Sequence, residues 1–190
     1  MFLANHDTSI RLVDWESKTA IMGRVDCRDT GEKLAMKHNL LAHDDLSWAH
    51  YHEADDHPYA ISYWGHILDI DDAGHLSLLY RWDPHSYCHF HRHLCTTTSV
   101  VLEGELHVST YENGEPVNST VRRRGHYSKM PPGDVHMEQG GPTGALVLFE
   151  LYAPDGQLTE QLYPDGTVKR TLTIDDLRKM MDRQQQLVAA

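Results

Sequence analysis

The sequence has few cysteines and no long apolar run. Its 190 residues include three cysteines, Cys27, Cys88 and Cys95, and none stands in a Cys-x-x-Cys pair. Such a set does not form a disulfide framework, so we expect a reducing compartment. Cys88 and Cys95 are expected as small buried side chains, with metal ligation by a thiol as the alternative. Without a run of roughly 18 apolar residues or a signal-peptide pattern, a soluble, cytoplasmic protein is predicted.

Basic residues are scarce as well. Lys and Arg number 17 against 28 Asp and Glu, which gives a formal net charge of −11. This charge argues against nucleic acid and anionic membranes as partners. The only basic cluster, Arg122-Arg123-Arg124, is expected on an exposed part of a strand or turn, with anion binding as the alternative. An apolar fraction of 40% favours one globular domain with appendages over disorder.

Histidine, in contrast, is abundant, with 15 residues. Because side chains alternate along a strand, His91 and His93 are expected to project from one face. Imidazole nitrogens at about 2.0–2.1 Å from a metal can hold it from such a pair. His136 follows the turn signal Pro131-x-Gly133 and is expected to open the next strand and close the site from the opposite wall of a barrel. We therefore predict His91, His93 and His136 as metal ligands.

The two histidine segments resemble the two motifs of the cupin superfamily. Residues 91–104 have the form H-x-H-x3-T-x6-G, and residues 125–140 have the form G-x5-P-x-G-x2-H-x3-G. The usual cupin forms are G-x5-H-x-H-x3,4-E-x6-G and G-x5-P-x-G-x2-H-x3-N. This chain departs from them in three places: no glycine stands near Asp83-Pro84, Thr97 occupies the position of the metal-binding Glu, and Gly140 replaces Asn. The resemblance with Thr97 in that position implies a site of three histidines.

Short apolar segments separated by turn signals indicate a β-sandwich or barrel. Asn113-Gly114 predicts a hairpin between residues 105–111 and 117–122, and residues 158–172 predict another. With the resemblance, this gives an all-β fold: a cupin double-stranded β-helix, or jelly-roll barrel, at residues 64–172. An irregular N-terminal arm is expected at residues 1–63, and an amphipathic C-terminal helix at residues 173–190 that packs on the barrel or on another subunit. The His/Asp-rich residues 38–57 are expected as a loop or covering arm, with a second metal site as the alternative.

One branch of the cupins has a similar three-histidine pattern. It contains acetylacetone-cleaving dioxygenase and 2,4'-dihydroxyacetophenone dioxygenase, in which the histidine pair also precedes the motif glycine by 13 and 11 residues, as His91 and His93 precede Gly104. The resemblance implies non-haem Fe(II), O2 and cleavage of a C–C bond in a small dicarbonyl or hydroxyketone substrate. Imidazole donors also suit Zn and Ni, and Mn is a further alternative.

Three further residues are candidates for catalytic roles. Thr97 could orient water, O2 or substrate through its hydroxyl, or merely line the wall. His89 shares the expected face of the histidine pair, as a pocket residue or a surface histidine. Glu138 lies two residues after His136 and could act as an acid–base group or accept a hydrogen bond from a ligating imidazole. The alternative for Glu138 is a salt bridge near the surface.

Two other functions remain open on this scaffold. One is a redox-neutral Zn or Mn isomerase, lyase or hydrolase, and the other is a non-enzymatic, ligand-sensing cupin. A small-molecule substrate is the expected partner, together with O2 in the dioxygenase hypothesis. A homodimer is expected from the fold class and the apolar terminal helix.

Overall fold

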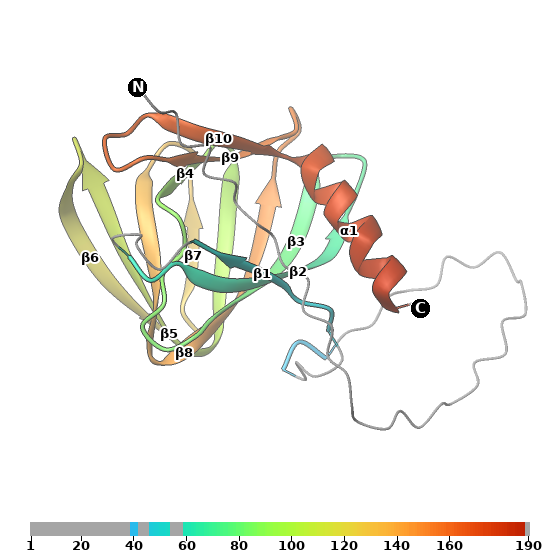
Figure 1. Cartoon of the computed structure of the whole chain (residues 1–190), viewed down its shortest axis with the longest axis horizontal. Coiled ribbons are helices and arrows are strands. Elements are labelled where there is room, and N and C mark those ends of the chain that lie inside the picture. The colour runs from blue at the N-terminus through green and yellow to red at the C-terminus, as the bar shows by residue number, and fades with distance from the viewer. Residues whose placement is uncertain (1–38, 42–45, 54–58, 189–190) are drawn as a thin grey trace, which may run out of the picture.

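A computed structural model describes residues 39–41, 46–53 and 59–188, and this part of the chain forms ten strands and one helix (Figure 1). In chain order these are β1 (Ala49–His52), β2 (Ser62–Ile70), β3 (His75–Trp82), β4 (His91–His93), β5 (Thr96–Glu112), β6 (Glu115–Arg123), β7 (Tyr127–Met130), β8 (Val135–Tyr152), β9 (Gln157–Leu162), β10 (Val168–Thr173) and α1 (Ile174–Val188).

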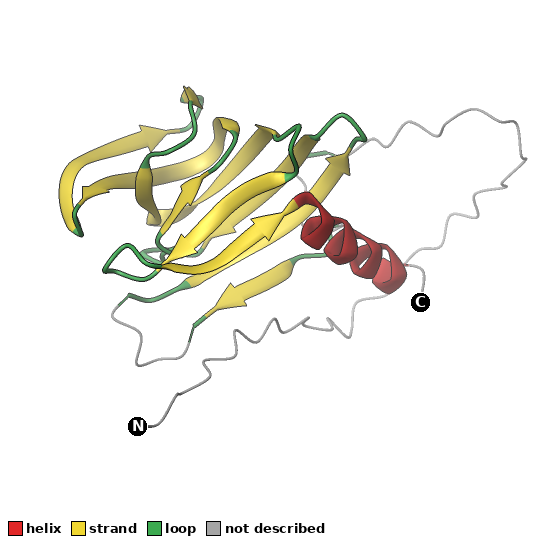
Figure 2. Cartoon of the chain, turned by 90° about the horizontal axis from the view of Figure 1, so that it is seen from above, coloured by secondary structure: helices red, strands yellow, loops and turns green. Residues whose placement is uncertain are grey.

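The strands form one antiparallel sheet that curls on itself (Figures 1 and 2). Its order is β1-β2-β3-β8-β4-β9-β10, and β5 pairs with β6, β7 and β8. The long strands β5 and β8 pair along most of their length and bend near Gly104, where the register shifts. Gly104 has a positive φ of 68°, and a Cβ there would clash with the carbonyl oxygen of Gly144. This bend lets β8 pair with β4 at one end and β3 at the other, which produces the predicted jelly-roll barrel.

The barrel interior is filled by one face of each strand. On β3, Leu76, Leu78 and Trp82 point inward and are almost completely buried. The opposite face of the same strand carries Leu79, which packs outside the barrel with residues of the described arm such as Trp48. Burial of one such leucine side chain contributes about 1.5–3 kcal/mol. The alternation along β3 therefore fixes which side chains line the interior.

The C-terminal helix begins after Thr173. The Thr173 hydroxyl accepts a hydrogen bond from the backbone NH of Asp176 (3.3 Å), and the Asp176 carboxylate accepts one from the NH of Thr173 (3.1 Å). This reciprocal cap satisfies amide donors at the first turn. Ile174 and Leu177 are buried in the barrel core, so the apolar stripe packs on the barrel. No helix among the described residues is long and apolar enough to cross a membrane.

The expected arm, residues 1–63, contributes to the sheet where it is described. β1 lies within it and pairs with β2, with Ala49 opposite Gly65 and His52 opposite Ser62. Cys27 lies outside the described residues, as do residues 38, 42–45 and 54–57 of the His/Asp-rich segment. Within that segment, the ring of His50 stacks on Trp64 at 4.0 Å and its Nε2 lies 3.0 Å from the Ser62 hydroxyl.

Candidate metal centre

Four side chains converge inside the barrel: His91 and His93 from β4, and His136 and Glu138 from β8. One donor atom from each lies within 4.8 Å of all the others. His91 stands directly opposite His136 in the β4–β8 register. The histidines therefore meet from two paired, neighbouring strands, whereas the sequence predicted that His136 would approach from the opposite wall. The imidazoles of His91 and His136 are therefore separated by the spacing of two adjacent strands and not by the width of the barrel.

The spacing of the donor atoms fits one metal ion. The Nε2 atoms of His91 and His93 are 3.3 Å apart, and His136 Nε2 is 3.3 Å from Glu138 Oε1. His91 Nε2 lies 3.7 Å from Glu138 Oε2. Bonds of about 2.0–2.1 Å place adjacent donors of an octahedral or tetrahedral ion about 2.8–3.4 Å apart. A divalent ion would need only small side-chain adjustments to bind all four residues.

Backbone carbonyl groups orient two of the imidazole rings. His91 Nδ1 donates to the carbonyl oxygen of His89 at 2.7 Å, and His136 Nδ1 donates to that of Asp134 at 3.0 Å. With the proton on Nδ1, the lone pair lies on Nε2 and faces the cluster. His93 Nδ1 is buried and has no hydrogen-bond partner among the described residues. That third ring is held by packing and by the contact of its Nε2 with His91 Nε2 at 3.3 Å.

Glu138 is a buried carboxylate, with only 4% of the residue exposed. The Cys88 thiol donates to its Oε2 at 2.8 Å. Burial acts to raise the pKa of Glu138, but His91 and His136 outweigh it and hold that pKa well below the usual value. Burial raises the pKa of Cys88 well above its ordinary value, so the thiol keeps its proton. The carboxylate thus joins the cluster, in contrast to the surface salt bridge considered from the sequence, and changes the expected three-histidine set to three histidines and a glutamate.

The protonation of the imidazoles suits metal binding. Burial lowers the pKa of His91 to about 4 and that of His93 well below its ordinary value. Both rings are therefore neutral near pH 7, as metal ligands must be. Burial also acts to lower the pKa of His136, but the Glu138 carboxylate beside it produces a net rise. His136 is accordingly the ring that retains a proton most readily, and a metal ion would displace that proton.

The other two candidate residues lie beside the cluster. Thr97 is buried, and its hydroxyl donates to the Cys95 carbonyl oxygen at 3.4 Å. His89 is also buried, with Nδ1 3.0 Å from the Tyr63 hydroxyl and Nε2 2.9 Å from Glu53 Oε1. Neither is part of the four-residue cluster. His89 is a pocket residue that links β2 to the segment after β1.

A hydrogen-bonded chain extends from His89 toward the barrel surface. Glu53 Oε1 accepts a hydrogen bond from Lys169 Nζ at 2.6 Å as well as contacting His89. The hydrogen bond with His89, aided by Lys169, lowers the pKa of Glu53 to about 2, so this carboxylate is ionised. This contact could not be predicted from the sequence, because residues 53, 89 and 169 are far apart in the chain and come together only in the fold.

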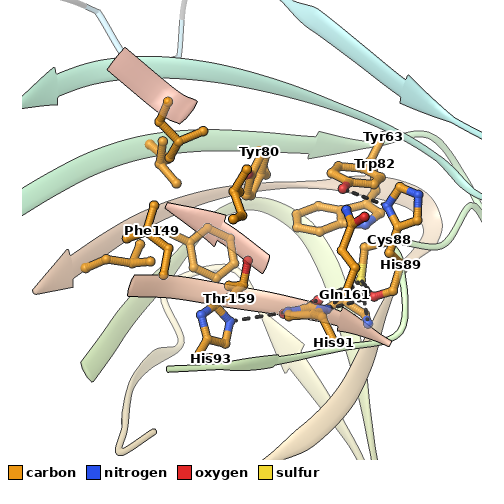
Figure 3. Close-up of a pocket in the computed structure, with 16 residues that line it drawn as sticks. Tyr63, Tyr80, Trp82, Cys88, His89, His91, His93, Phe149, Thr159 and Gln161 are labelled. Carbon is orange, nitrogen blue, oxygen red and sulfur yellow. Dashed lines mark hydrogen bonds and ion pairs between the residues drawn. The ribbon is translucent and has the colours of Figure 1, made fainter. Parts of the chain in front are cut away.

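The first of two cavities at the cluster encloses about 620 Å³, part of it open to solvent. Its aromatic walls include Tyr63, Tyr80, Trp82 and Phe149, and His91 and His93 line it as well (Figure 3). Two polar residues from β9 also line this cavity. Gln161 pairs with His91 and Thr159 with His93 across the β4–β9 register. The sequence missed both, because alternation predicts the face of a residue but not its neighbour on the next strand.

The second cavity encloses about 450 Å³, part of it open to solvent, and has a different lining. It shares His93, Glu138 and Phe149 with the first cavity. The polar residues that line it without belonging to the cluster are Thr97, Ser99, Thr110, Arg122 and Asp134. The cluster therefore borders one space with aromatic walls and another whose walls combine hydroxyl groups and an arginine with apolar residues such as Val108 and Met130.

The departures from the cupin motifs have a spatial explanation. A Cβ at Gly140 would lie 2.5 Å from the Asp83 carbonyl oxygen and 2.9 Å from Trp82 Cβ, so the usual Asn would not fit here. Trp82 and Asp83, which lie where the first motif lacks its glycine, thus occupy the space that an Asn side chain at position 140 would need. Likewise, Thr97 brings no carboxylate, and Glu138 supplies one from β8.

No family model matches the sequence, and no curated protein matches it. Solved structures show the fold. An acetylacetone dioxygenase from Acinetobacter johnsonii is similar, with a TM-score of 0.56 and 11% identity over 86% of this chain and 99% of that chain. A protein from Methylibium petroleiphilum, provisionally assigned as an acetylacetone dioxygenase, has a TM-score of 0.56 and 12% identity over 84% of this chain and 99% of that one.

A Ralstonia eutropha protein of unknown function with a cupin-like fold has a TM-score of 0.53 and 18% identity, over 65% of this chain and 73% of its own. Together with the strand topology, these likenesses show that the chain has the cupin fold predicted from its motifs.

Proposed function

We propose that this protein is a non-haem metal-dependent dioxygenase that uses Fe(II) and O2 to cleave a C–C bond in a small dicarbonyl or hydroxyketone. The observation that carries this proposal is the cluster of three histidines and one glutamate beside a cavity with aromatic walls. The similarity in fold to acetylacetone dioxygenases, over almost their whole length, supports it.

The donor set suits such a reaction. Imidazole and carboxylate donors together bind Fe(II), Mn(II) and Zn(II). Four protein donors leave about two further positions on an octahedral ion, enough for the two oxygens of a chelating substrate or for one oxygen and O2. Bound Fe(II) would supply the electron transfer between an electron-rich chelate and O2. His91, His93, His136 and Glu138 are the residues proposed to hold it.

The protein residues around the cluster would position the substrate. Phe149 and Trp82 are buried and line the first cavity, so they would exclude water from the substrate. Gln161 and Thr159 lie beside the ligating histidines and offer amide and hydroxyl groups to substrate oxygens. In the second cavity, the Thr97 hydroxyl donates to the Cys95 carbonyl oxygen and would orient water or substrate by accepting a hydrogen bond. Glu138 is proposed as the fourth ligand. His89 is proposed to support the pocket through its contact with the Tyr63 hydroxyl.

A redox-neutral Zn or Mn enzyme is the second candidate, and Glu138 is the observation that favours it. A carboxylate donor lowers the net charge of the loaded site and suits Mn(II) in particular. An isomerase, lyase or hydrolase with this site would turn over without O2. A non-enzymatic sensor would bind metal or a small ligand without turnover.

The deciding experiment begins with elemental analysis of protein purified anaerobically from cells grown without added metal. Iron near one equivalent, followed by O2 uptake with acetylacetone or a hydroxyketone, supports the dioxygenase. Zinc or manganese, with turnover that is unaffected by removal of O2, would instead indicate a redox-neutral enzyme. The expected homodimer stays a prediction, which light scattering on the eluted protein checks.

A further inference from the structure

The second cavity contains one arginine, Arg122, and no other Lys or Arg lines it. This side chain comes from β6, whose other residues are all exposed. Arg122 is the exception because it turns into the barrel, whereas Arg123 and Arg124 in the same triplet are exposed. The fold thus separates one arginine of the triplet from its two neighbours.

Arg122 has spare hydrogen-bonding capacity. Its Nη1 donates to the Ser128 hydroxyl at 3.0 Å, and no carboxylate lies within 4.0 Å of it among the described residues. Arg123, in contrast, pairs with Glu105 at 3.2 Å. A guanidinium has five N–H donors in a planar fork, which matches the two oxygens of a carboxylate. Burial of this cation is costly, and the charge of Glu138 offsets part of that cost without forming an ion pair with it. An anionic ligand at the guanidinium would offset more of it.

The cavity walls also carry hydroxyl groups beside Arg122. Thr97 and Ser99 are buried, and Thr110 lines the same space. Two carboxylates, Asp134 and Glu138, also line the cavity. Glu138 is engaged by Cys88 and the imidazoles, but its charge remains. Their presence disfavours a dianion such as phosphate more than a singly charged carboxylate.

We infer that the second cavity binds the carboxylate group of a small organic anion through Arg122. This inference rests on the proposed function. It limits the substrate to carbonyl compounds that also carry a carboxylate group. The carboxylate would sit at Arg122 and the chelating oxygens at the cluster, since His93 and Glu138 line the same cavity. A neutral diketone would leave Arg122 with Ser128 as its only hydrogen-bond partner among the described residues.

The test uses the full chain and needs neither iron nor O2. Binding of trifluoroacetate and of its neutral analogue trifluoroacetamide is measured from ¹⁹F line broadening, on chelator-treated protein and again on Zn-loaded protein. The variants are Arg122→Gln and Arg122→Lys, with Arg124→Gln as a control of identical charge change in the same triplet. We expect trifluoroacetate to bind more tightly than the amide, and roughly tenfold more weakly to Arg122→Gln. Arg122→Lys should keep part of the affinity.

Two results would overturn this inference. One is trifluoroacetate binding no more tightly than trifluoroacetamide in either form of the protein. The other is an equal loss in Arg124→Gln and Arg122→Gln, since that would reflect net charge alone. Because the titration does not depend on turnover, a protein that consumes no O2 but binds trifluoroacetate through Arg122 would refute the dioxygenase and leave the anion site intact.

Discussion

The two cavities that meet at the cluster differ in chemistry although they share part of their walls. The first is bounded by Tyr63, Tyr80 and Trp82, and the second by hydroxyl groups and Arg122. His93, Glu138 and Phe149 belong to both. The interior of this barrel is therefore not uniformly apolar. β2 and β3 bring aromatic residues to one side of the cluster, whereas the two ends of β5 and the inward residue of β6 bring polar ones.

Phe149 lies in the shared wall, and its loss should have the largest effect on stability. The residue is 5% exposed, so Phe149→Ala removes a packed ring and leaves a void between the two cavities. We expect the free energy of unfolding to fall by about 3–5 kcal/mol in urea titrations. Val117→Ala on exposed β6 is the control, with an expected change within about 0.5 kcal/mol. Similar losses for the two variants would mean that Phe149 is not a structural wall.

Removal of one histidine should separate metal binding from folding. His136→Ala deletes a donor that opposes His91 across β4 and β8, so metal affinity should fall by at least about 100-fold. The barrel core does not include this side chain, and circular dichroism of the metal-free variant should match that of the parent. Unchanged metal content by elemental analysis would rule out His136 as a ligand.

The position of the carboxylate can be tested by moving it. Glu138→Gln keeps the shape but removes the charge, and metal affinity should fall by about 10- to 100-fold. Adding Thr97→Glu to that variant restores a carboxylate at the usual cupin position and should recover part of the loss. Calorimetric titration with Zn(II) measures both. A double variant no better than Glu138→Gln would show that residue 97 does not reach the ion.

The metal-free protein should become less stable on acidification. Burial lowers the folded-state pKa of His91 to about 4 and also lowers that of His93, so protons bind the unfolded chain first as the pH falls below about 6.5. For His91 alone, about 1–2 kcal/mol should be lost between pH 7 and pH 5. His136 acts in the opposite direction, because its pKa is raised and its contribution is lost as the pH rises.

Urea unfolding at several pH values measures this dependence, and the slope should decrease in His91→Gln. A variant with the parent's pH dependence would mean that the imidazole of His91 titrates normally in the folded protein.

Much of the fold could be predicted because it depends on local signals. The Asn113-Gly114 turn joins β5 and β6, with both residues at positive φ, and Thr173 with Asp176 begins the helix where the sequence placed it. Alternation put His91 with His93, and His136 with Glu138, on common faces. The sequence did not reveal β1, at residues 49–52 of the expected arm. This strand has only four residues, and its pairing with β2 forms in the folded sheet.

The donor types, the faces of their strands and the turns that end those strands follow from the sequence alone, because they depend on residues close together in the chain. Which faces meet depends on the folded barrel. The β4–β8 register brings Glu138 to the histidines, the β4–β9 register places Thr159 and Gln161 beside them, and the curl of the sheet turns Arg122 inward. Register and curl are set by packing between segments far apart in sequence, and a period of two residues carries no information about them.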